Sequence, residues 1–370
     1  MNLVPFQAIY PNLDLVTSPE LFFKSLKSKY VEYNNSGFFR KSSQESIYVY
    51  QLKTENRVHK GIITSTEIGD FINGKVLKHE NTLAAKEQIM MNLMLQNKAM
   101  VKPVLLAYDN VIEIDAFINK IISTENPFFE INFDTNQEVH TIWQVTDGDV
   151  VNVVSQYFKN KVPHCYIADG HHRVKTSILL HTANKSNDQL GAKLDNVLSI
   201  YFSWDELAVY DYNRCIDVFQ NHSPLQFMAS LSQYFKIKPI KRAKRPKQKH
   251  EMTMVMYGEW YRLRIKPSIL ANHSDEVVLF DTFILNEYVL KAILGIENAR
   301  EDIRIHYLDG VAGPEGMENL VAKKETRVGF CLFPINYSDI KIIADNDKTL
   351  PPKSTWFEPR IKNGIIIKDF

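Results

Sequence analysis

The chain has 370 residues, of which 45% are hydrophobic and 24% are charged. This composition is typical of a globular protein long enough for one large or two medium domains. The 44 basic and 43 acidic side chains leave a net charge of +1, so the strong positive charge of most nucleic-acid-binding proteins is absent. No apolar stretch approaches the ~20 residues that span a bilayer, and the first residues lack a signal-peptide pattern, so we expect a cytoplasmic protein without a membrane partner.

The three cysteines, Cys165, Cys215 and Cys331, lie far apart in the sequence and form no CxxC pair. This spacing argues against a disulfide framework and against a thiolate metal site. We expect all three thiols to be buried and reduced.

In the first part of the chain, predicted strands alternate with predicted helices. Apolar spacing at helical or strand periodicity gives these assignments. The elements are a helix over 21–33, a hairpin of strands 47–52 and 61–64, a strand at 76–77, a helix over 83–96, strands at 104–108 and 141–145, a helix over 150–160, and a strand ending at 168. In the helix over 83–96 we expect Ile89, Met90, Leu93 and Met94 to share a buried side, with the methionines filling the core.

The second part of the chain changes character after a strand at 197–202. Residues 236–250 hold eight Lys or Arg in fifteen residues with two prolines, which predicts an exposed loop. A patch for nucleic acid there would lack aromatic side chains between its charges. Further predicted elements are strands at 260–265, 303–307 and 328–333 and helices over 281–294 and 337–344.

These elements predict an α+β (mixed α/β) fold, in which mixed sheets are flanked by helices. We expect two parts. Residues 1–220 form the α/β core that carries the polar motifs, and residues 221–370 form a C-terminal α/β part packed on it. No internal repeat is visible.

The most informative segment runs from Cys165 to Ser177 and reads as a buried strand, a polar loop and the start of a helix. Gly170 allows a tight backbone, and the amides of a helix start attract anions. The loop also places Asp169, His171, His172 and Arg173 together, which offers a carboxylate, two imidazoles and a guanidinium for a phosphate. Alternatively, Asp169 caps the helix and both histidines are solvated.

A second polar cluster, Lys78, His79 and Glu80, follows the strand at 76–77. None of the common sequence motifs of nucleotide-binding and hydrolytic enzymes is present. A carboxylate, a phosphate-binding helix start and basic side chains are the minimum set for phosphoryl transfer. Alternatively, the cluster is a charged turn before a helix.

Two other readings of the loop stay open. Asp169, His171 and His172 could ligate Mn²⁺ or Zn²⁺ in a metal-dependent phosphoesterase, although adjacent helix residues point about 100° apart. The chain could also be a non-catalytic regulator that binds nucleotide or DNA, although its near-neutral charge and the lack of a helix-turn-helix argue against a nucleic-acid partner.

Six segments occur in the order found in one protein family: Pro5 to Ala8, Gly74 to Thr82 with Lys86 and Glu87, Pro103 to Leu106, Tyr166 to Arg173, Ala292 to Gly295, and Pro351 to Thr355. In this order they resemble domain-of-unknown-function family 1015 of bacteria and archaea. The sequence departs from the family pattern at Val174, where an aromatic residue often stands, and at Tyr212 to Arg214, where a Thr-His-Arg-like turn is usual. The family's early Pro-Pro-Tyr-Asp stretch is not evident.

More remotely, the strand, DGHHR loop and helix are similar to the phosphate-binding element of the ParB and sulfiredoxin-like superfamily, and especially to its free serine kinases. The resemblance implies a ParB-like strand-loop-helix phosphate site in the central part of the chain. It also implies ATP or ADP with Mg²⁺ as cofactor. Sulfiredoxin chemistry is not implied, because His171 stands at the position of the reactive cysteine.

The resemblance assigns roles to individual residues. Glu80 would accept the hydroxyl proton, and Asp169 would hold substrate or Mg²⁺, with His79 and His172 as further catalytic candidates. Nucleotide phosphates would be bound by Lys78, Gly170, His171, His172, Arg173 and Lys353. Lys353 would take part only if the C-terminal part closes over the site, and is otherwise a solvated lysine in a Pro-rich turn.

The interpretation that unites these observations is that the chain is a nucleotide-dependent phosphotransferase acting on a small hydroxyl metabolite, with free serine or phosphoserine favoured. The partners are then a small-molecule substrate and a nucleotide. The sequence leaves the oligomeric state open, a homodimer included.

Overall fold

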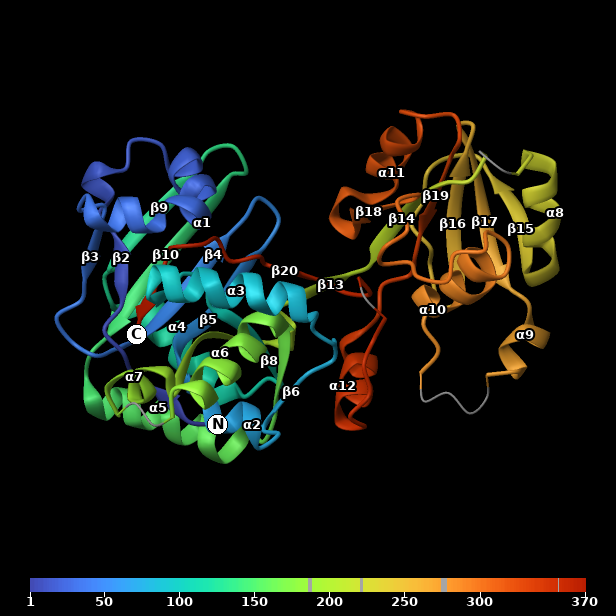
Figure 1. The fold of residues 1–370 in the computed structure, drawn as a ribbon. Coiled ribbons are helices and arrows are strands. Elements are labelled where there is room, and N and C mark those ends of the chain that lie inside the picture. The colour runs from blue at the N-terminus through green and yellow to red at the C-terminus, as the bar shows by residue number, and fades with distance from the viewer. Residues whose placement is uncertain (186–187, 220–221, 274–277, 352) are drawn as a thin grey trace. The chain divides into compact units, whose positions relative to one another are not determined.

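The computed structural model describes residues 1–185, 188–219, 222–273, 278–351 and 353–370 (Figure 1). The chain forms two compact units, one of residues 1–208 with 359–370 and the other of residues 209–358. The division expected at residue 220 therefore lies at 208, and the C-terminal segment returns to the first unit. It returns because β21 (Lys368–Asp369) pairs with β7 (Ala99–Met100).

The first unit is built on a mixed sheet. Its strand order is β6-β11-β8-β12-β5-β4-β10-β9, with β1 also paired to β5. β11 runs parallel to β6 and antiparallel to β8, whereas β8 and β12 are parallel. The strands are β1 (Leu3–Val4), β4 (Ile47–Lys53), β5 (Val58–Glu67), β6 (Val76–Leu77), β8 (Val104–Tyr108), β9 (Phe129–Phe133), β10 (Glu138–Val145), β11 (Cys165–Asp169) and β12 (Asn196–Ser203). A separate pair joins β2 (Ile9–Pro11) to β3 (Phe39–Lys41).

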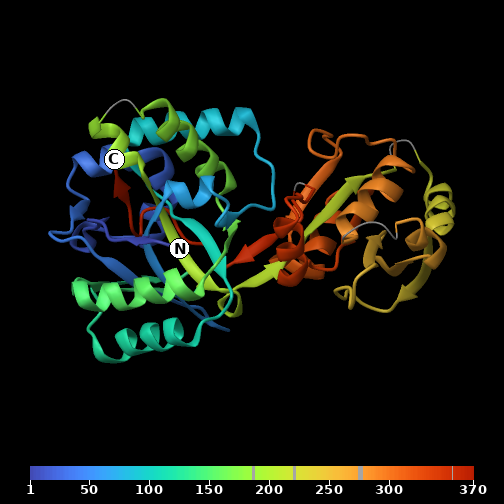
Figure 2. The same ribbon diagram turned by 90° about the horizontal axis from the view of Figure 1, so that it is seen from below.

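Helices cover both faces of this sheet. Figures 1 and 2 show α3 and α6 on one face and α4 and α5 on the other. Local signals set the helix starts, since Ser18 caps α1 and Asp147 caps α5 with its side chain. The helices are α1 (Pro19–Asn35), α2 (Ile68–Ile72), α3 (Ala84–Asn97), α4 (Ile112–Thr124), α5 (Gly148–Lys161), α6 (His171–Ala183) and α7 (Asp188–Leu194), with short 3-10 turns η1 (Leu13–Leu15) and η2 (Trp204–Glu206).

The second unit is built on an antiparallel sheet of order β15-β17-β16-β19-β14-β18. Successive strand residues point to opposite faces. Ile216 and Met254 therefore enter one hydrophobic core, while Cys215 and Val255 enter a second core against helix α11 (Gly313–Val321). The strands are β14 (Tyr212–Asp217), β15 (Phe235–Ile240), β16 (Glu251–Met256), β17 (Glu259–Ile265), β18 (Ile305–Asp309) and β19 (Arg327–Cys331), and β13 (Ala208–Tyr210) pairs separately with β20 (Trp356–Glu358).

The helices of the second unit are short. Ser223 and Gln226 form a capping box at the start of α8. The helix expected over 281–294 divides into α10 and a π-helical turn. The helices are α8 (Pro224–Tyr234), α9 (Pro267–Ala271), α10 (Asp281–Leu285), the π-helix η3 (Asn286–Lys291), the 3-10 turn η4 (Gly310–Ala312), α11 (Gly313–Val321) and α12 (Tyr337–Asp345).

The expected fold class is confirmed, since mixed sheets are flanked by helices in a mixed α/β chain. Some local expectations were wrong. The predicted basic loop begins as a strand, because residues 236–240 belong to β15. This strand lies at the edge of its sheet, so the missing N–H of Pro239 removes no hydrogen bond between strands. In α3, Ile89 is 68% exposed, and Met94 is buried whereas Met90 and Met91 are only half-buried. All three cysteines are free and buried, as expected.

A search of the described residues finds no helix with the length and apolar content needed to cross a membrane.

Candidate functional site

The two polar motifs meet because β6 and β11 are neighbouring parallel strands. Val76 pairs with Cys165 and Leu77 with Tyr166, so both strands end at the same edge of the sheet. Lys78 to Glu80 follow β6, and the DGHHR loop follows β11. The carboxyl ends of parallel strands are a common place for ligand sites in α/β sheets.

A bulge in β11 positions Asp169. The pairing of β11 with β8 shifts between Ile167 and Asp169, so Ala168 is the extra residue. Bulges of this kind redirect the side chain that follows, and they are frequent beside active sites. Gly170 then adopts a φ of +110°, which begins α6 at His171.

Asp169 is surrounded by positive charge. Its Oδ2 lies 2.9 Å from Arg173 Nη2 and 3.3 Å from Lys102 Nζ. Burial alone would raise the pKa of Asp169, but the charges of Arg173, Lys102 and Arg360 outweigh it and hold the pKa well below its usual range. The carboxylate therefore stays ionised and organises the cations.

Two cations, Lys102 and Arg173, pair directly with the Asp169 carboxylate, and the charge of Arg360 also acts on it. Burial lowers the pKa of Lys102, which shows the cost of holding that charge away from water. The Nε atom of Arg173 is buried and has no hydrogen-bond partner among the described residues. The cluster at the start of α6 is therefore suited to an anion, and phosphate oxygens would satisfy the remaining donors.

Glu80 and His171 face each other beside this cluster. The Oε2 atom of Glu80 lies 4.0 Å from His171 Nδ1. The main-chain N–H of His79 donates a hydrogen bond to His171 Nε2 at 3.4 Å. Nε2 therefore acts as an acceptor, which places the ring proton on Nδ1, toward Glu80.

Both buried histidines are neutral at physiological pH. Burial lowers the pKa of His79 to about 3 and lowers that of His171 well below its usual value. The His79 ring packs edge-on against that of His171, with 4.6 Å between centroids. The His79 ring therefore packs against the His171 ring and helps to fix its orientation. Because both imidazoles are neutral, neither supplies a positive charge to a phosphate.

The remaining sequence-predicted residues are placed differently. His172 Nε2 accepts a hydrogen bond from the main-chain N–H of Leu83 at 3.2 Å, which fastens the segment before α3. Lys78 is exposed. Lys353 belongs to the second unit, where its Nζ lies 3.4 Å from the hydroxyl of Tyr212. Its part in the site of the first unit stays a prediction.

Sequence reasoning missed a cavity that reaches this cluster. It has a volume of about 280 Å³, and its lining includes Met90, Leu93, Met94, Met100, Lys102 and Arg173. The cavity is apolar along α3 and positively charged where Lys102 and Arg173 enter it. The signal was present in α3, whose spaced methionines were interpreted as core. Lys102 and Arg360 gave no signal, because neither lies in a polar motif.

Among the described residues, no group of three or more His, Cys, Asp or Glu side chains could hold a metal ion. His171 and His172 instead have separate partners on the His79 and Leu83 amides. The metal-dependent phosphoesterase reading therefore lacks its ligand set in this part of the chain.

The model of one protein family, described as "Protein of unknown function (DUF1015)", matches residues 9–284. The chain belongs to this family. The match includes both polar motifs and ends within α10 of the second unit. The comparison with curated proteins finds no match.

Solved structures to which the chain is similar include truncated SbnI from Staphylococcus aureus, at a TM-score of 0.42 and 11% identity over 81% of this chain and 85% of that one. A free serine kinase in complex with AMP has a TM-score of 0.39 and 12% identity, over 82% of this chain and 92% of that one. A conserved hypothetical protein from Pyrococcus furiosus has a TM-score of 0.39 and 12% identity, over 83% of this chain and 95% of that one. Likeness at this level does not by itself say what the chain binds.

Proposed function

We propose that the chain is a nucleotide-dependent phosphotransferase whose acceptor is a small hydroxyl metabolite, with free serine as the first candidate. The observation that carries this proposal is the position of the Glu80 and His171 pair beside the three cations around Asp169. A base and a phosphate-binding cluster at one sheet edge are the parts that phosphoryl transfer requires.

Each part has a distinct role in this proposal. Lys102, Arg173 and the first amides of α6 bind the phosphates, and Asp169 holds the two side chains in place. Glu80 accepts the proton of the attacking hydroxyl, and the Nδ1–H of neutral His171 orients that carboxylate. The 280 Å³ cavity takes the nucleoside, whose flat base suits a lining of methionine and leucine.

The proposal includes a magnesium ion that arrives with the nucleotide and is held mainly by its phosphates. Mg²⁺ is usually held by one or two carboxylates together with substrate phosphates. Asp169 and Glu80 are the carboxylates available here. Bound there, the ion would neutralise developing charge on the transferred phosphoryl group.

A direct assay tests the proposal. Purified protein with Mg²⁺ and either ATP or ADP is incubated with serine, phosphoserine and a panel of other hydroxyl compounds, and phosphorylated products are measured. We expect transfer that falls at least about hundredfold in Glu80→Gln, in line with the loss of a general base. Glu55→Gln, in the exposed turn between β4 and β5, serves as the matched control.

Two results would overturn the proposal. One is the absence of phosphoryl transfer in either direction with every acceptor. The other is equal activity in Glu80→Gln and the unmodified protein. Circular dichroism of each variant establishes that it is folded.

A further inference from the structure

The second unit contains a buried carboxylate that lacks a partner for one of its oxygens. Asp281 begins α10 and is 4% exposed. Its Oδ2 accepts a hydrogen bond from the main-chain N–H of His250 at 3.2 Å. Its Oδ1 is buried and has no hydrogen-bond partner among the residues that the structure describes. Leaving a buried acceptor unpaired is costly, and buried polar atoms are nearly always satisfied.

Asp281 lines a small cavity of about 20 Å³, together with Thr282, Asp339, Lys249 and Ser354. A cavity of this size holds one water molecule, and an ammonium group is of similar size. The small cavity is therefore large enough for a single donor group next to Asp281 but too small for a larger ligand.

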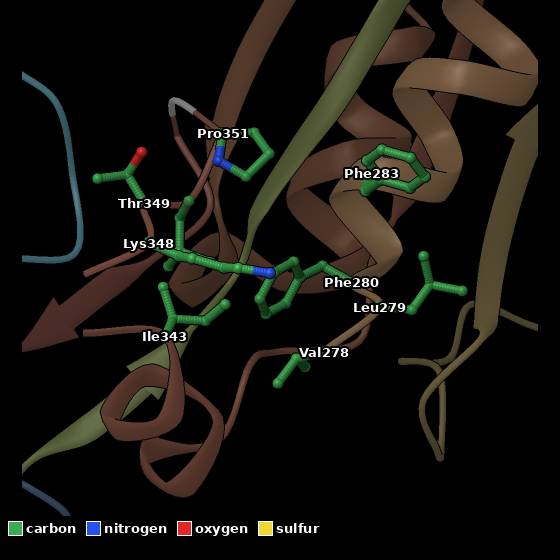
Figure 3. Close-up of a pocket in the computed structure, with 9 residues that line it drawn as sticks. Val278, Leu279, Phe280, Phe283, Ile343, Lys348, Thr349 and Pro351 are labelled. Carbon is green, nitrogen blue, oxygen red and sulfur yellow. The ribbon is translucent and has the colours of Figure 1, made fainter. Parts of the chain in front are cut away.

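A larger cavity adjoins it, because Leu279 and Phe280 line both. The larger cavity has a volume of about 320 Å³. Figure 3 shows its apolar side chains, among them Phe280, Phe283, Ile343 and Pro351, around the extended side chain of Lys348. This volume is near the lower end of the range for small-molecule sites.

The charges around Asp281 favour a cationic ligand group. Lys249 Nζ already lies 2.5 Å from Asp339 Oδ2, so its charge is shared with another carboxylate. Burial raises the pKa of Asp281 to about 7, and the negative charge of Asp211 adds to this shift. The hydrogen bond from the His250 amide and the charge of Lys249 oppose it. A donor with a positive charge would satisfy Oδ1 and relieve this electrostatic cost at the same time.

We propose that the second unit binds a small primary amine with an apolar body. The ammonium group donates to Asp281 Oδ1 in the small cavity, and the body lies in the larger cavity against Phe280, Phe283 and Ile343. The site is separate from the phosphotransferase site of the first unit, so either proposal can fail without the other.

Calorimetric titration of the full chain tests this site with two pairs of probes. These are 3-methylbutylamine with 3-methylbutanol, and 2-phenylethylamine with 2-phenylethanol. We expect saturable binding of the amines and at least about tenfold weaker binding of the alcohols, a difference of ~1.4 kcal/mol. Asp281→Asn removes the negative charge at nearly constant volume and should weaken amine binding by the same factor. Glu301→Gln, an exposed acidic position in the same unit, should leave it unchanged.

A second variant covers the case in which Asp281→Asn does not fold. Ile343→Phe narrows the larger cavity without touching the carboxylate, and it should weaken 2-phenylethylamine more than methylamine. Equal binding of amines and alcohols would overturn the proposal, as would unchanged affinity in a folded Asp281→Asn. The absence of saturable amine binding would also overturn it and would mean that the small cavity holds only water.

Discussion

Asp169 Oδ2 and Arg173 Nη2 are 2.9 Å apart across the first turn of α6. The pair closes the loop around Gly170, because the guanidinium occupies the space that a Cβ of this residue would need. A carboxylate that fixes an arginine in this way gives up its role as a base and becomes a positioning group for the cation. In the proposed function, Glu80 is then the carboxylate left to accept a proton.

The guanidinium of Arg173 is the first feature to test. Arg173→Ala removes a charge-assisted contact to phosphate, and we expect a loss of about 1.5–3 kcal/mol, or about ten- to hundredfold in ATP affinity. Arg173→Lys should recover only part of this, because an ammonium keeps the charge but not the fork geometry. Calorimetric ATP titrations measure the effect.

Two variants serve as comparisons in those titrations. Lys353→Ala should change affinity little, since its Nζ lies against Tyr212 in the second unit. Arg40→Ala removes an exposed arginine paired with Asp14 and should have no effect. Unchanged affinity in Arg173→Ala, with binding present in the unmodified protein, would remove the DGHHR loop from the site.

The backbone at Gly170 is the second feature to test. Its φ of +110° is unfavourable for any residue with a Cβ, and a Cβ there would lie 2.7 Å from Arg173 Nη2. Gly170→Ala should therefore destabilise the fold by about 1–3 kcal/mol and also displace the guanidinium, so that ATP binding weakens.

Gly37→Ala separates the two effects of that change. Gly37 also has a positive φ, of +79°, but nothing lies within 4 Å of its added Cβ. It should cost about 1–2 kcal/mol of stability without changing ATP affinity. Urea unfolding and calorimetry on both variants make the comparison. Full ATP affinity in a folded Gly170→Ala would contradict the proposed role of the loop.

Local patterns in the sequence were enough to predict the strand, the loop and the helix at DGHHR, and the short strand before Lys78. Periodicity and turn residues report on neighbours in sequence, and both elements formed as expected. The pairing of Val76 with Cys165 is not visible in this way, because it joins strands that lie far apart in the chain. The resemblance to a family, and not any spacing, suggested that the two motifs work together.

Lys102 and Arg360 show where sequence reasoning stops. Each becomes important only because the fold places its charge near Asp169, and Arg360 comes from the returning C-terminal segment. The unit boundary was misplaced for a related reason. The strand Tyr212–Asp217 precedes the predicted division at residue 220, yet it pairs with strands of the second sheet, and no sequence pattern showed this long-range pairing.

The cavity along α3 predicts that nucleoside and phosphates are bound by different residues. Leu93→Trp should fill much of this cavity and weaken ATP binding about tenfold, equivalent to ~1.4 kcal/mol. Binding of inorganic triphosphate should stay the same, because Lys102 and Arg173 are intact. Leu95→Trp, on the exposed side of the same helix, is the matched control. Equal weakening of ATP and triphosphate would argue against a nucleoside in this cavity.

The raised pKa of Asp281 makes the stability of the second unit depend on pH. Burial raises the pKa of Asp281 to about 7, and the charge of Asp211 adds to this shift while Lys249 opposes it. The pKa of an Asp side chain in an unfolded chain is about 3.9. Between these values the folded state binds a proton that the unfolded state releases, so this group lowers stability as pH rises from about 4 to about 7, by roughly 1.4 kcal/mol per pKa unit. Asp281→Asn should therefore gain stability relative to the unmodified protein between pH 5 and pH 8, as measured by urea unfolding. Asp302→Asn is the control, because Arg304 lowers the pKa of Asp302 and its effect should be constant over that range. If the difference in free energy of unfolding between Asp281→Asn and the unmodified protein were also constant from pH 5 to pH 8, Asp281 would be ionised over that whole range.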